Sequence, residues 1–268
     1  MVGQYYVIDA HCHVYPDAIA ERAVAGTSNF YSVPFAMDGT EHTLRRASEE
    51  AGVDHCVIQS VATSPRQVKS INEFIARVVS EGKGRYTGLG TLHPDSTDME
   101  GDVRHLLELG LHGIKLHPDI QQFPIDDPRC DAIYELCSEF RLPILMHTGD
   151  RRYDYSNPNR LIPTLLRFPK LTVVGAHLGG WSIWEEVSDQ LKKIPNLYYD
   201  CSSSFPWIGP ETVQWIIRKL GADRVMFGTD YPMWEPKREL DVFFAMKLTA
   251  EEKKAIRSEN AKRIFSIV

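Results

Sequence analysis

The sequence predicts a (β/α)8 barrel as one domain over residues 1–268. Eight short apolar runs alternate with segments of helical period, and no linker-like or low-complexity stretch interrupts them. From the second run onward the starts lie roughly 25 to 31 residues apart, which is the size of a right-handed βαβ unit. Eight such units in 268 residues fit a closed barrel better than an open sheet, which usually has fewer strands.

The predicted strands are short and rich in β-branched residues. They are Tyr5–Ile8, Cys56–Val61, Tyr86–Leu92, Gly113–Leu116, Ile144–Met146, Leu171–Gly175, Leu197–Tyr199 and Val225–Phe227. The segments of helical period between them are often opened by Pro, Ser or Asp. They are Thr40–Ala51, Val68–Ser80, Met99–Leu109, Pro128–Phe140, Pro158–Phe168, Ile183–Lys193 and Pro210–Leu220.

Two segments fall outside the repeat: an insertion, Tyr15–Gly39, after the first strand, and a helical tail, Thr249–Ile267. The insertion is long enough to form a lid, and its Phe30, Tyr31 and Phe35 would then cover a ligand. The alternative is an insertion that packs on the barrel rim without contacting a ligand.

Composition narrows the range of partners. With 30 Lys and Arg against 36 Asp and Glu, the net charge is −6, so we expect no nucleic-acid partner. No apolar stretch approaches the roughly 20 residues that span a bilayer, and no signal peptide opens the chain, which favours a cytoplasmic protein without a membrane partner. The five cysteines form no Cys-Xaa-Xaa-Cys pair, so we expect them to be reduced. A small molecule is the expected substrate, and a homodimer is left open.

Polar residues follow the predicted strands with unusual regularity. Chemistry in a barrel takes place at the carboxyl ends of the strands. Six of the ten histidines lie at those ends, and an aspartate follows the eighth strand. They are His11, His13, His93, His117, His147, His177 and Asp230.

His11 and His13 are two residues apart, so both imidazoles point to the same face of a strand. His147 and Asp230 follow strands that converge on the same mouth, and Zn²⁺ favours imidazole and carboxylate ligands. A single His-Xaa-His pair is as often structural as metal-binding. Together with His147, His177 and Asp230, the pair predicts a site for a divalent metal ion, with zinc as the first expectation.

At this point the chain resembles a known family, the amidohydrolase superfamily. The resemblance is to the amidohydrolase-related branch, which also contains aminocarboxymuconate-semialdehyde decarboxylase. The matching segments run from one end of the chain to the other and agree with the barrel predicted above. They are Ile8–His13, Gly113–Pro118, His147–Gly149, Ala176–Gly180, Phe227–Pro232 and Asn260–Phe265.

The resemblance implies that His11, His13, His147 and Asp230 are metal ligands, usually of zinc. It also implies that Asp230 accepts the proton of the metal-bound water and that His177 is the second catalytic group. The chemistry is consistent, because a bound ion lowers the pKa of water from 15.7 toward roughly 7. His177 would orient the nucleophile or stabilise the developing negative charge.

Lys115 has two interpretations. In binuclear members of the superfamily a lysine at the end of strand four is carbamylated and bridges two metals, with His177 as a further ligand. Members of the resembled branch are often mononuclear, so we expect one dominant metal and an unmodified Lys115 amine. His117 lies two residues on and faces the same way, either toward substrate or against Pro118.

Besides His117, three residues are candidates for substrate binding. Arg151 and Arg152 follow strand five, where a guanidinium binds a carboxylate in bidentate fashion; the alternative is that both are solvated. Trp181 follows strand six, where it lines an aromatic pocket or packs at the rim. Asp9 lies on the face of His11, and we expect it to support the ligands.

The leading functional hypothesis is a metal-dependent hydrolase of an amide, lactone or ester-like bond in a small anionic substrate. The alternative is a metal-dependent, non-oxidative decarboxylase. Some aromatic-acid decarboxylases of the branch carry Glu-Xaa-His where this chain has His11-Cys12-His13, which tilts the balance weakly toward hydrolysis. A barrel that only binds a ligand is disfavoured, because every expected catalytic position holds a competent residue.

Overall fold

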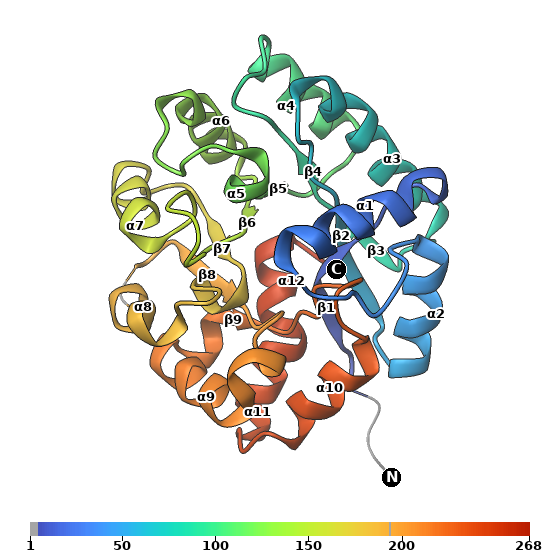
Figure 1. Cartoon of the computed structure of the whole chain (residues 1–268), viewed down its shortest axis with the longest axis vertical. Coiled ribbons are helices and arrows are strands. Elements are labelled where there is room, and N and C mark those ends of the chain that lie inside the picture. The colour runs from blue at the N-terminus through green and yellow to red at the C-terminus, as the bar shows by residue number, and fades with distance from the viewer. Residues whose placement is uncertain (1–4, 193) are drawn as a thin grey trace.

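A computed structural model describes residues 5–192 and 194–268, and within them the chain forms the predicted barrel. All strand pairs are parallel. The third strand is interrupted at Leu89, so its halves join the strands on either side. The barrel closes between the last and first strands, where Ala10 N donates to Phe227 O at 2.9 Å and Cys12 pairs with Tyr231. The eight-strand prediction is confirmed (Figure 1).

The strands are short, and the third predicted strand corresponds to β3 and β4. They are β1 (Ile8–His13), β2 (His55–Gln59), β3 (Tyr86–Gly88), β4 (Gly90–Thr91), β5 (Ile114–Leu116), β6 (Ile144–Met146), β7 (Val173–Gly175), β8 (Leu197–Asp200) and β9 (Val225–Met226).

Every predicted helix is present among the described residues, and α1, α5 and α10 are additional. The helices are α1 (Asp17–Tyr31), α2 (Glu41–Ala51), α3 (Val68–Glu81), α4 (Met99–Glu108), α5 (Pro118–Gln121), α6 (Asp131–Phe140), α7 (Pro158–Arg167), α8 (Trp184–Leu191), α9 (Phe205–Leu220), α10 (Pro236–Ala245), α11 (Ala250–Lys254) and α12 (Asn260–Phe265). Lys193, the predicted end of one helix, lies outside the described residues, as do residues 1–4 of the predicted domain. None of the described helices combines the length and the apolarity needed to cross a membrane.

The prediction of the first strand was wrong in position. The apolar run Tyr5–Ile8 suggested a strand before the polar residues, but β1 runs through them, from Ile8 to His13. Tyr5 and Tyr6 are instead 48% and 40% exposed. The strand continues because its polar side chains are buried with partners: Asp9 is fully buried and accepts from Thr229 N at 2.9 Å.

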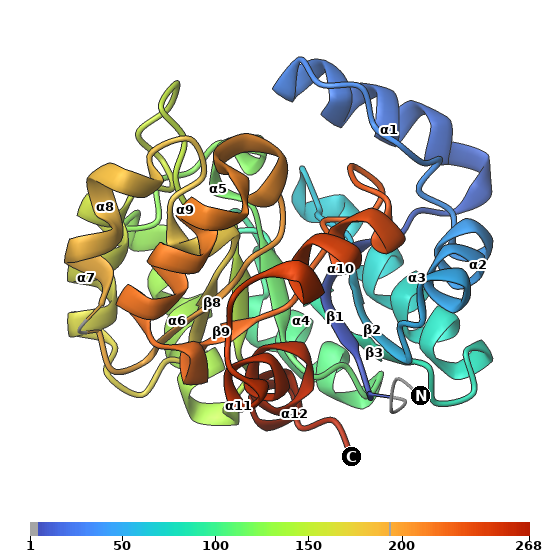
Figure 2. The ribbon, with the colours of Figure 1, turned by 90° about the horizontal axis from the view of Figure 1, so that it is seen from below.

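The interior of the barrel at its amino-terminal end is apolar. Inward-facing side chains from the strands, including Ile8, Ala10 and Met226, form one buried cluster. The helical tail closes this end, because Ala261 and Phe265 of α12 belong to the same cluster. Figure 2 shows α11 and α12 beneath the barrel, beside both chain ends.

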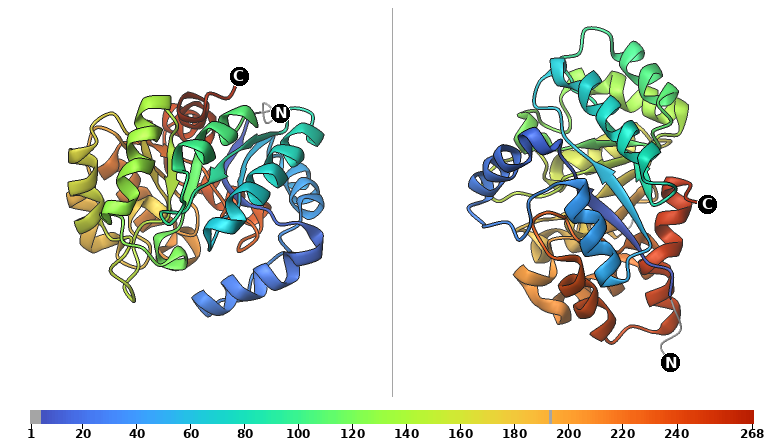
Figure 3. Two further views of the ribbon diagram at one scale, coloured as in Figure 1. Left: turned by 90° about the horizontal axis from the view of Figure 1, so that it is seen from above. Right: turned by 90° about the vertical axis from the view of Figure 1, so that its right-hand side faces the viewer.

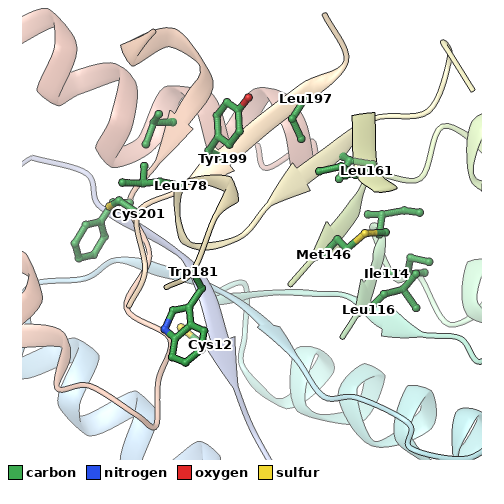
Figure 4. Packing of buried hydrophobic residues seen from close by; sticks show 14 of the residues in the cluster. Cys12, Ile114, Leu116, Met146, Leu161, Leu178, Trp181, Leu197, Tyr199 and Cys201 are labelled. Carbon is green, nitrogen blue, oxygen red and sulfur yellow. The ribbon is translucent and has the colours of Figure 1, made fainter. Parts of the chain in front are cut away.

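A second apolar layer lies between the strands and the outer helices. Along β5, Ile114 and Leu116 face this layer while Lys115 faces the interior, as the two-residue period of a strand requires. Figure 4 shows part of the layer, with Leu161 of α7 above Met146 of β6. This packing holds the carboxyl ends of the strands in place around the mouth.

The insertion predicted as a lid contains α1, which stands over the mouth at the end opposite α12 (Figures 2 and 3). The two ends of the insertion are tied together, because Tyr15 N donates to Gly39 O at 2.9 Å. Backbone bonds from Ala36 and Met37 to Met233 and Pro232 join it to the loop after β9. The insertion is therefore anchored at its base while α1 extends over the barrel.

Candidate active site

A cavity of about 560 Å³ lies at the mouth of the barrel, beneath α1. Its polar floor comes from the carboxyl ends of the strands and comprises His11, His13, Lys115, His117, Asp119, His147, His177 and Asp230. Its walls are mainly apolar and come from the insertion, α3 and the loop after β9; they include Ile19, Phe30, Tyr31, Phe35, Ile71, Phe74 and Met233. The cavity therefore suits a small molecule with a polar end and an apolar body.

Three donor atoms on the floor form a nearly equilateral triangle. His11 Nε2 lies 3.2 Å from His13 Nε2. Asp230 Oδ1 lies 3.4 Å from His11 Nε2 and 3.6 Å from His13 Nε2. Ligand atoms about 2.0–2.2 Å from one tetrahedral ion stand roughly 3.3–3.6 Å from each other. These residues fit a divalent metal ion in both donor type and spacing.

Asp200 fixes the orientation of His11. Its Oδ2 lies 3.0 Å from His11 Nδ1, and its Oδ1 accepts from the backbone N–H groups of His177 and Ser202. Burial would raise the pKa of Asp200, but the charges of His11 and His177 and the hydrogen bonds outweigh it and hold that pKa below its ordinary value. An ionised Asp200 keeps the proton of His11 on Nδ1, which leaves the Nε2 lone pair for a metal ion.

His147, the fourth predicted ligand, stands beside this triangle and not within it. Its Nδ1 lies 3.1 Å from His177 Nε2, and its Nε2 lies 3.2 Å from Gly149 O. Since a carbonyl oxygen only accepts, the proton of His147 is on Nε2. The same argument places the proton of His177 on Nδ1, which lies 3.0 Å from Ser202 O.

The facing nitrogens of His147 and His177 therefore both carry lone pairs. Burial lowers the pKa of His177 to about 4 and that of His147 well below 6.5, so both rings are neutral at pH 7. Two lone pairs at 3.1 Å repel each other, and a proton or a cation between or beside them relieves that repulsion. This pair is a second electron-rich part of the floor.

Asp230 follows β9 in a left-handed backbone conformation, with φ of 63°. Its Oδ2 accepts from Ser203 Oγ at 2.6 Å, which leaves Oδ1 for the triangle. Burial opposes ionisation, but the charges of His11 and His177 and the Ser203 bond together lower the pKa of Asp230 below 3.8. Left-handed conformations at non-glycine residues are strained and concentrate at functional sites.

Lys115 is buried on β5 with its Nζ 3.0 Å from His11 Nε2. Burial lowers the pKa of Lys115 to about 8, although Asp230 and Asp200 act in the opposite direction. The amine therefore faces the triangle, and its charge is only moderately favoured at neutral pH.

His117 lies against the other floor histidines. Its ring stacks on that of His147 with centroids 4.0 Å apart and planes 6° from parallel. Its Nε2 lies 2.6 Å from Tyr31 Oη, which links the floor to α1. Of the two sequence alternatives, the structure supports the one in which His117 faces the cavity, as part of its floor.

The candidate substrate-binding residues Arg151, Arg152 and Trp181 are not among the residues that line the described cavity. Arg151 pairs with Glu186 at 2.6 Å on the surface. Arg152 forms a bidentate pair with buried Asp150. Trp181 packs edge-on against Tyr31, with ring centroids 5.0 Å apart.

Two buried carboxylates in the site were missed. Asp200 ends β8, and the rule that located the histidines, a polar residue at the end of an apolar strand, would have identified it. Asp119 follows His117 by two residues and lies 3.7 Å from His147 Nε2. Neither of its oxygens has a hydrogen-bond partner among the described residues, and burial raises its pKa to about 7.

Comparisons with known proteins agree with this architecture. A family model described as Amidohydrolase matches residues 8–267. A 2-amino-3-carboxymuconate-6-semialdehyde decarboxylase from Dictyostelium discoideum is 26% identical over 198 residues, which cover 60% of this chain and 55% of that protein. The match thus spans about half the length of that curated relative.

Two solved structures have the same fold at low sequence identity. The 5-carboxyvanillate decarboxylase of Sphingomonas paucimobilis is 17% identical with a TM-score of 0.80, over 98% of this chain and 100% of that chain. The 5-carboxyvanillate decarboxylase of Novosphingobium aromaticivorans, complexed with manganese and a nitrobenzoic acid, is 16% identical with a TM-score of 0.75, over 98% and 97% of the two chains. At these identities the likeness is one of fold.

Proposed function

We propose, from the premise that this chain belongs to the amidohydrolase family, that it catalyses the metal-dependent, non-oxidative decarboxylation of a small carboxylated substrate. The observation that carries the proposal is the triangle of His11, His13 and Asp230 on the floor of a cavity with apolar walls. The sequence favoured hydrolysis, with decarboxylation as the alternative. The comparisons support the alternative better, because the named relatives are decarboxylases.

A divalent ion held by His11, His13 and Asp230, with His147 beside them, would supply Lewis-acid chemistry toward the substrate's oxygens. In decarboxylation the bond between the carboxyl carbon and its neighbour breaks, carbon dioxide leaves, and the electron pair stays on the neighbouring carbon until it takes a proton. His177 lines the cavity and carries a lone pair on Nε2, so it can take up a proton from water and deliver it to that carbon. The apolar side chains that α1 and α3 contribute to the walls would limit the access of water to the reacting carbon.

The test is a substrate screen that follows two products at once. Protein loaded with zinc or, in parallel, manganese is incubated with carboxylated aromatics, carboxylated enoates, lactones and amides. We expect carbon dioxide from at least one carboxylated compound and none from protein in which both His11 and His13 are replaced by Ala. Hydrolysis of a lactone or amide without carbon dioxide release from any compound would favour the hydrolase.

We further propose one dominant ion per chain and an unmodified Lys115 amine. Activity titrated against added metal should then reach its plateau near one equivalent and should not depend on bicarbonate. In the competing arrangement, the lone pairs of His147 and His177 and a carbamylated Lys115 would hold a second ion. A plateau near two equivalents, restored by bicarbonate and lost in Lys115→Ala, would establish that arrangement.

A further inference from the structure

A tyrosine at the end of α1 reaches down to the floor of the cavity. Tyr31 is the last residue of the helix, and its hydroxyl oxygen lies 2.6 Å from His117 Nε2. This is the single hydrogen bond that the Tyr31 side chain makes with the described residues. The contact joins a residue of the lid to a residue that stacks on His147 of the cavity floor.

The direction of this hydrogen bond follows from the other nitrogen of His117. The backbone N–H of Ile120 donates to His117 Nδ1 at 3.3 Å, where His117 caps the first turn of α5. A backbone N–H can only donate, so Nδ1 carries a lone pair and the ring proton is on Nε2. His117 Nε2 is therefore the donor and Tyr31 Oη the acceptor. The hydroxyl proton of Tyr31 is left without an acceptor among the described residues.

We propose that Tyr31 donates this proton in a hydrogen bond to a substrate oxygen, and that His117 is the positioning residue that directs it into the cavity. The inference rests on the proposed function for the kind of oxygen, which is a carboxylate or a carbonyl or phenolate oxygen conjugated with the reacting carbon. Tyr31 belongs to α1, so this hydrogen bond forms only when the lid lies over the cavity. Substrate binding and closure of the lid are therefore coupled.

The surroundings of Tyr31 hold the hydroxyl in this place. Trp181 packs edge-on against its ring, and the Arg152 guanidinium lies 5.3 Å from the ring centroid. Arg152 Nη1 also donates to Phe30 O at 2.5 Å, which fixes the end of the helix. A Phe ring in place of Tyr31 would keep these contacts and remove only the hydroxyl.

The first experiment needs no substrate. Nitrogen NMR of the zinc-loaded protein labelled with ¹⁵N-histidine reports which ring nitrogen of His117 is protonated, and His117→Asn identifies its signals by their loss. We expect the proton on Nε2. A proton on Nδ1 would overturn the inference whatever the enzyme's reaction proves to be.

The second experiment compares Tyr31→Phe, His117→Asn and the double variant on any compound that the screen finds to react. Asn retains the capping of α5 but is too short to reach Tyr31. We expect kcat/KM to fall about 10- to 100-fold in Tyr31→Phe, the range for a hydrogen bond to a charged group. The double variant should fall no further than Tyr31→Phe alone.

The control is Tyr198→Phe on β8, which removes the hydroxyl of a ring that packs against Arg224 and Arg263 and does not line the cavity. It should retain the kcat/KM of the unaltered protein. A Tyr31→Phe variant within about two-fold of normal, or losses that simply multiply in the double variant, would overturn the inference. If the reacting compound is a lactone that yields no carbon dioxide, the decarboxylase proposal fails. The comparison of the variants on that lactone then still decides whether Tyr31 donates a hydrogen bond to the substrate. If no compound reacts, the position of the His117 proton decides it.

Discussion

The two ends of the barrel are built from the same strands and have opposite character. β1 contributes Ile8 and Ala10 to the apolar cluster at one end and His11 and His13 to the cavity floor at the other. Met226 of β9 lies in the apolar cluster, and Asp230 follows four residues later at the mouth. One end is filled by side chains and closed by α12, whereas the other keeps a cavity of about 560 Å³.

The difference indicates where stability and chemistry reside. At the mouth, His177 and Asp230 have φ values of 58° and 63°, and buried neutral histidines face one another. Such features lower the stability of the folded state, and apolar packing elsewhere offsets them. We therefore expect substitutions at the mouth to change activity with little effect on unfolding, and substitutions at the closed end to do the reverse.

Replacing His11 and His13 together by Ala should produce the largest effect. Two corners of the triangle are lost, so metal content and turnover should both fall to background. Thermal unfolding of the metal-free protein should shift by only a few degrees, because the closed end is unchanged. Elemental analysis and circular dichroism measure the two outcomes, and full metal occupancy in the double variant would contradict the site.

Phe265→Ala tests the closed end. Phe265 is fully buried in the apolar cluster, and a Phe→Ala change in a core lowers the free energy of unfolding by about 3–5 kcal/mol. The value of kcat, measured well below the unfolding transition, should stay within about two-fold. Leu166→Ala, at a residue that is 68% exposed, is the matched control and should change stability by less than about 0.5 kcal/mol. A large fall in kcat with normal stability would mean that the two ends are coupled.

His177→Asn tests the mouth without removing a corner of the triangle. If His177 carries the proton in catalysis, kcat should fall about 100-fold, the usual scale for a lost acid or base. Metal content and unfolding temperature should stay close to those of the unaltered protein. Near-normal turnover in the folded, metal-loaded variant would exclude this role.

The same contrast explains what could be predicted from the sequence. Apolar runs and their spacing follow local periodicity, so the strands and helices were predicted closely, and polar residues after those runs located most of the cavity floor. β1 was misplaced because Asp9 and His11 are polar yet buried, and only their partners on distant segments, such as Thr229 and Asp200, make that favourable.

Contacts between distant segments could also not be predicted from the local sequence pattern. Nothing near Arg152 in the sequence indicates that it would hold the carbonyl of Phe30, 122 residues away. The link between Tyr31 and His117 spans 86 residues and depends on where α1 lies. Such contacts are properties of the assembled barrel.

Glu239 in the outer helix α10 belongs to neither end and should give stability a pH dependence of its own. It is 1% exposed, its Oε2 has no hydrogen-bond partner among the described residues, and burial raises its pKa to about 8 from 4.5. Between pH 4.5 and 8 the folded state then binds more protons than the unfolded state, so stability falls as pH rises.

The expected slope from Glu239 is up to about 1.4 kcal/mol per pH unit in that range. Glu239→Gln keeps a neutral side chain at every pH and should remove this part of the slope. Urea unfolding of the metal-free protein and of the variant from pH 5 to 8 measures the difference between the two slopes. Asp9 and Asp119 contribute equally to the slope of each protein and therefore cancel from this difference. Parallel curves would show that Glu239 is ionised in the folded state.

Arg151→Ala should have the smallest effect and marks the outer limit of the site. The sequence made Arg151 a candidate for binding a substrate carboxylate, but its side chain is 67% exposed and pairs with Glu186, which is 63% exposed. Ion pairs this exposed contribute roughly 0–1 kcal/mol, because water screens them and both side chains lose freedom. We expect KM and kcat within about two-fold of normal, and the same for Glu186→Gln, which breaks the pair from the other side. A rise in KM of ten-fold or more in Arg151→Ala alone would mean that the arginine leaves Glu186 to bind substrate, and the functional mouth would then extend to the loop after β6.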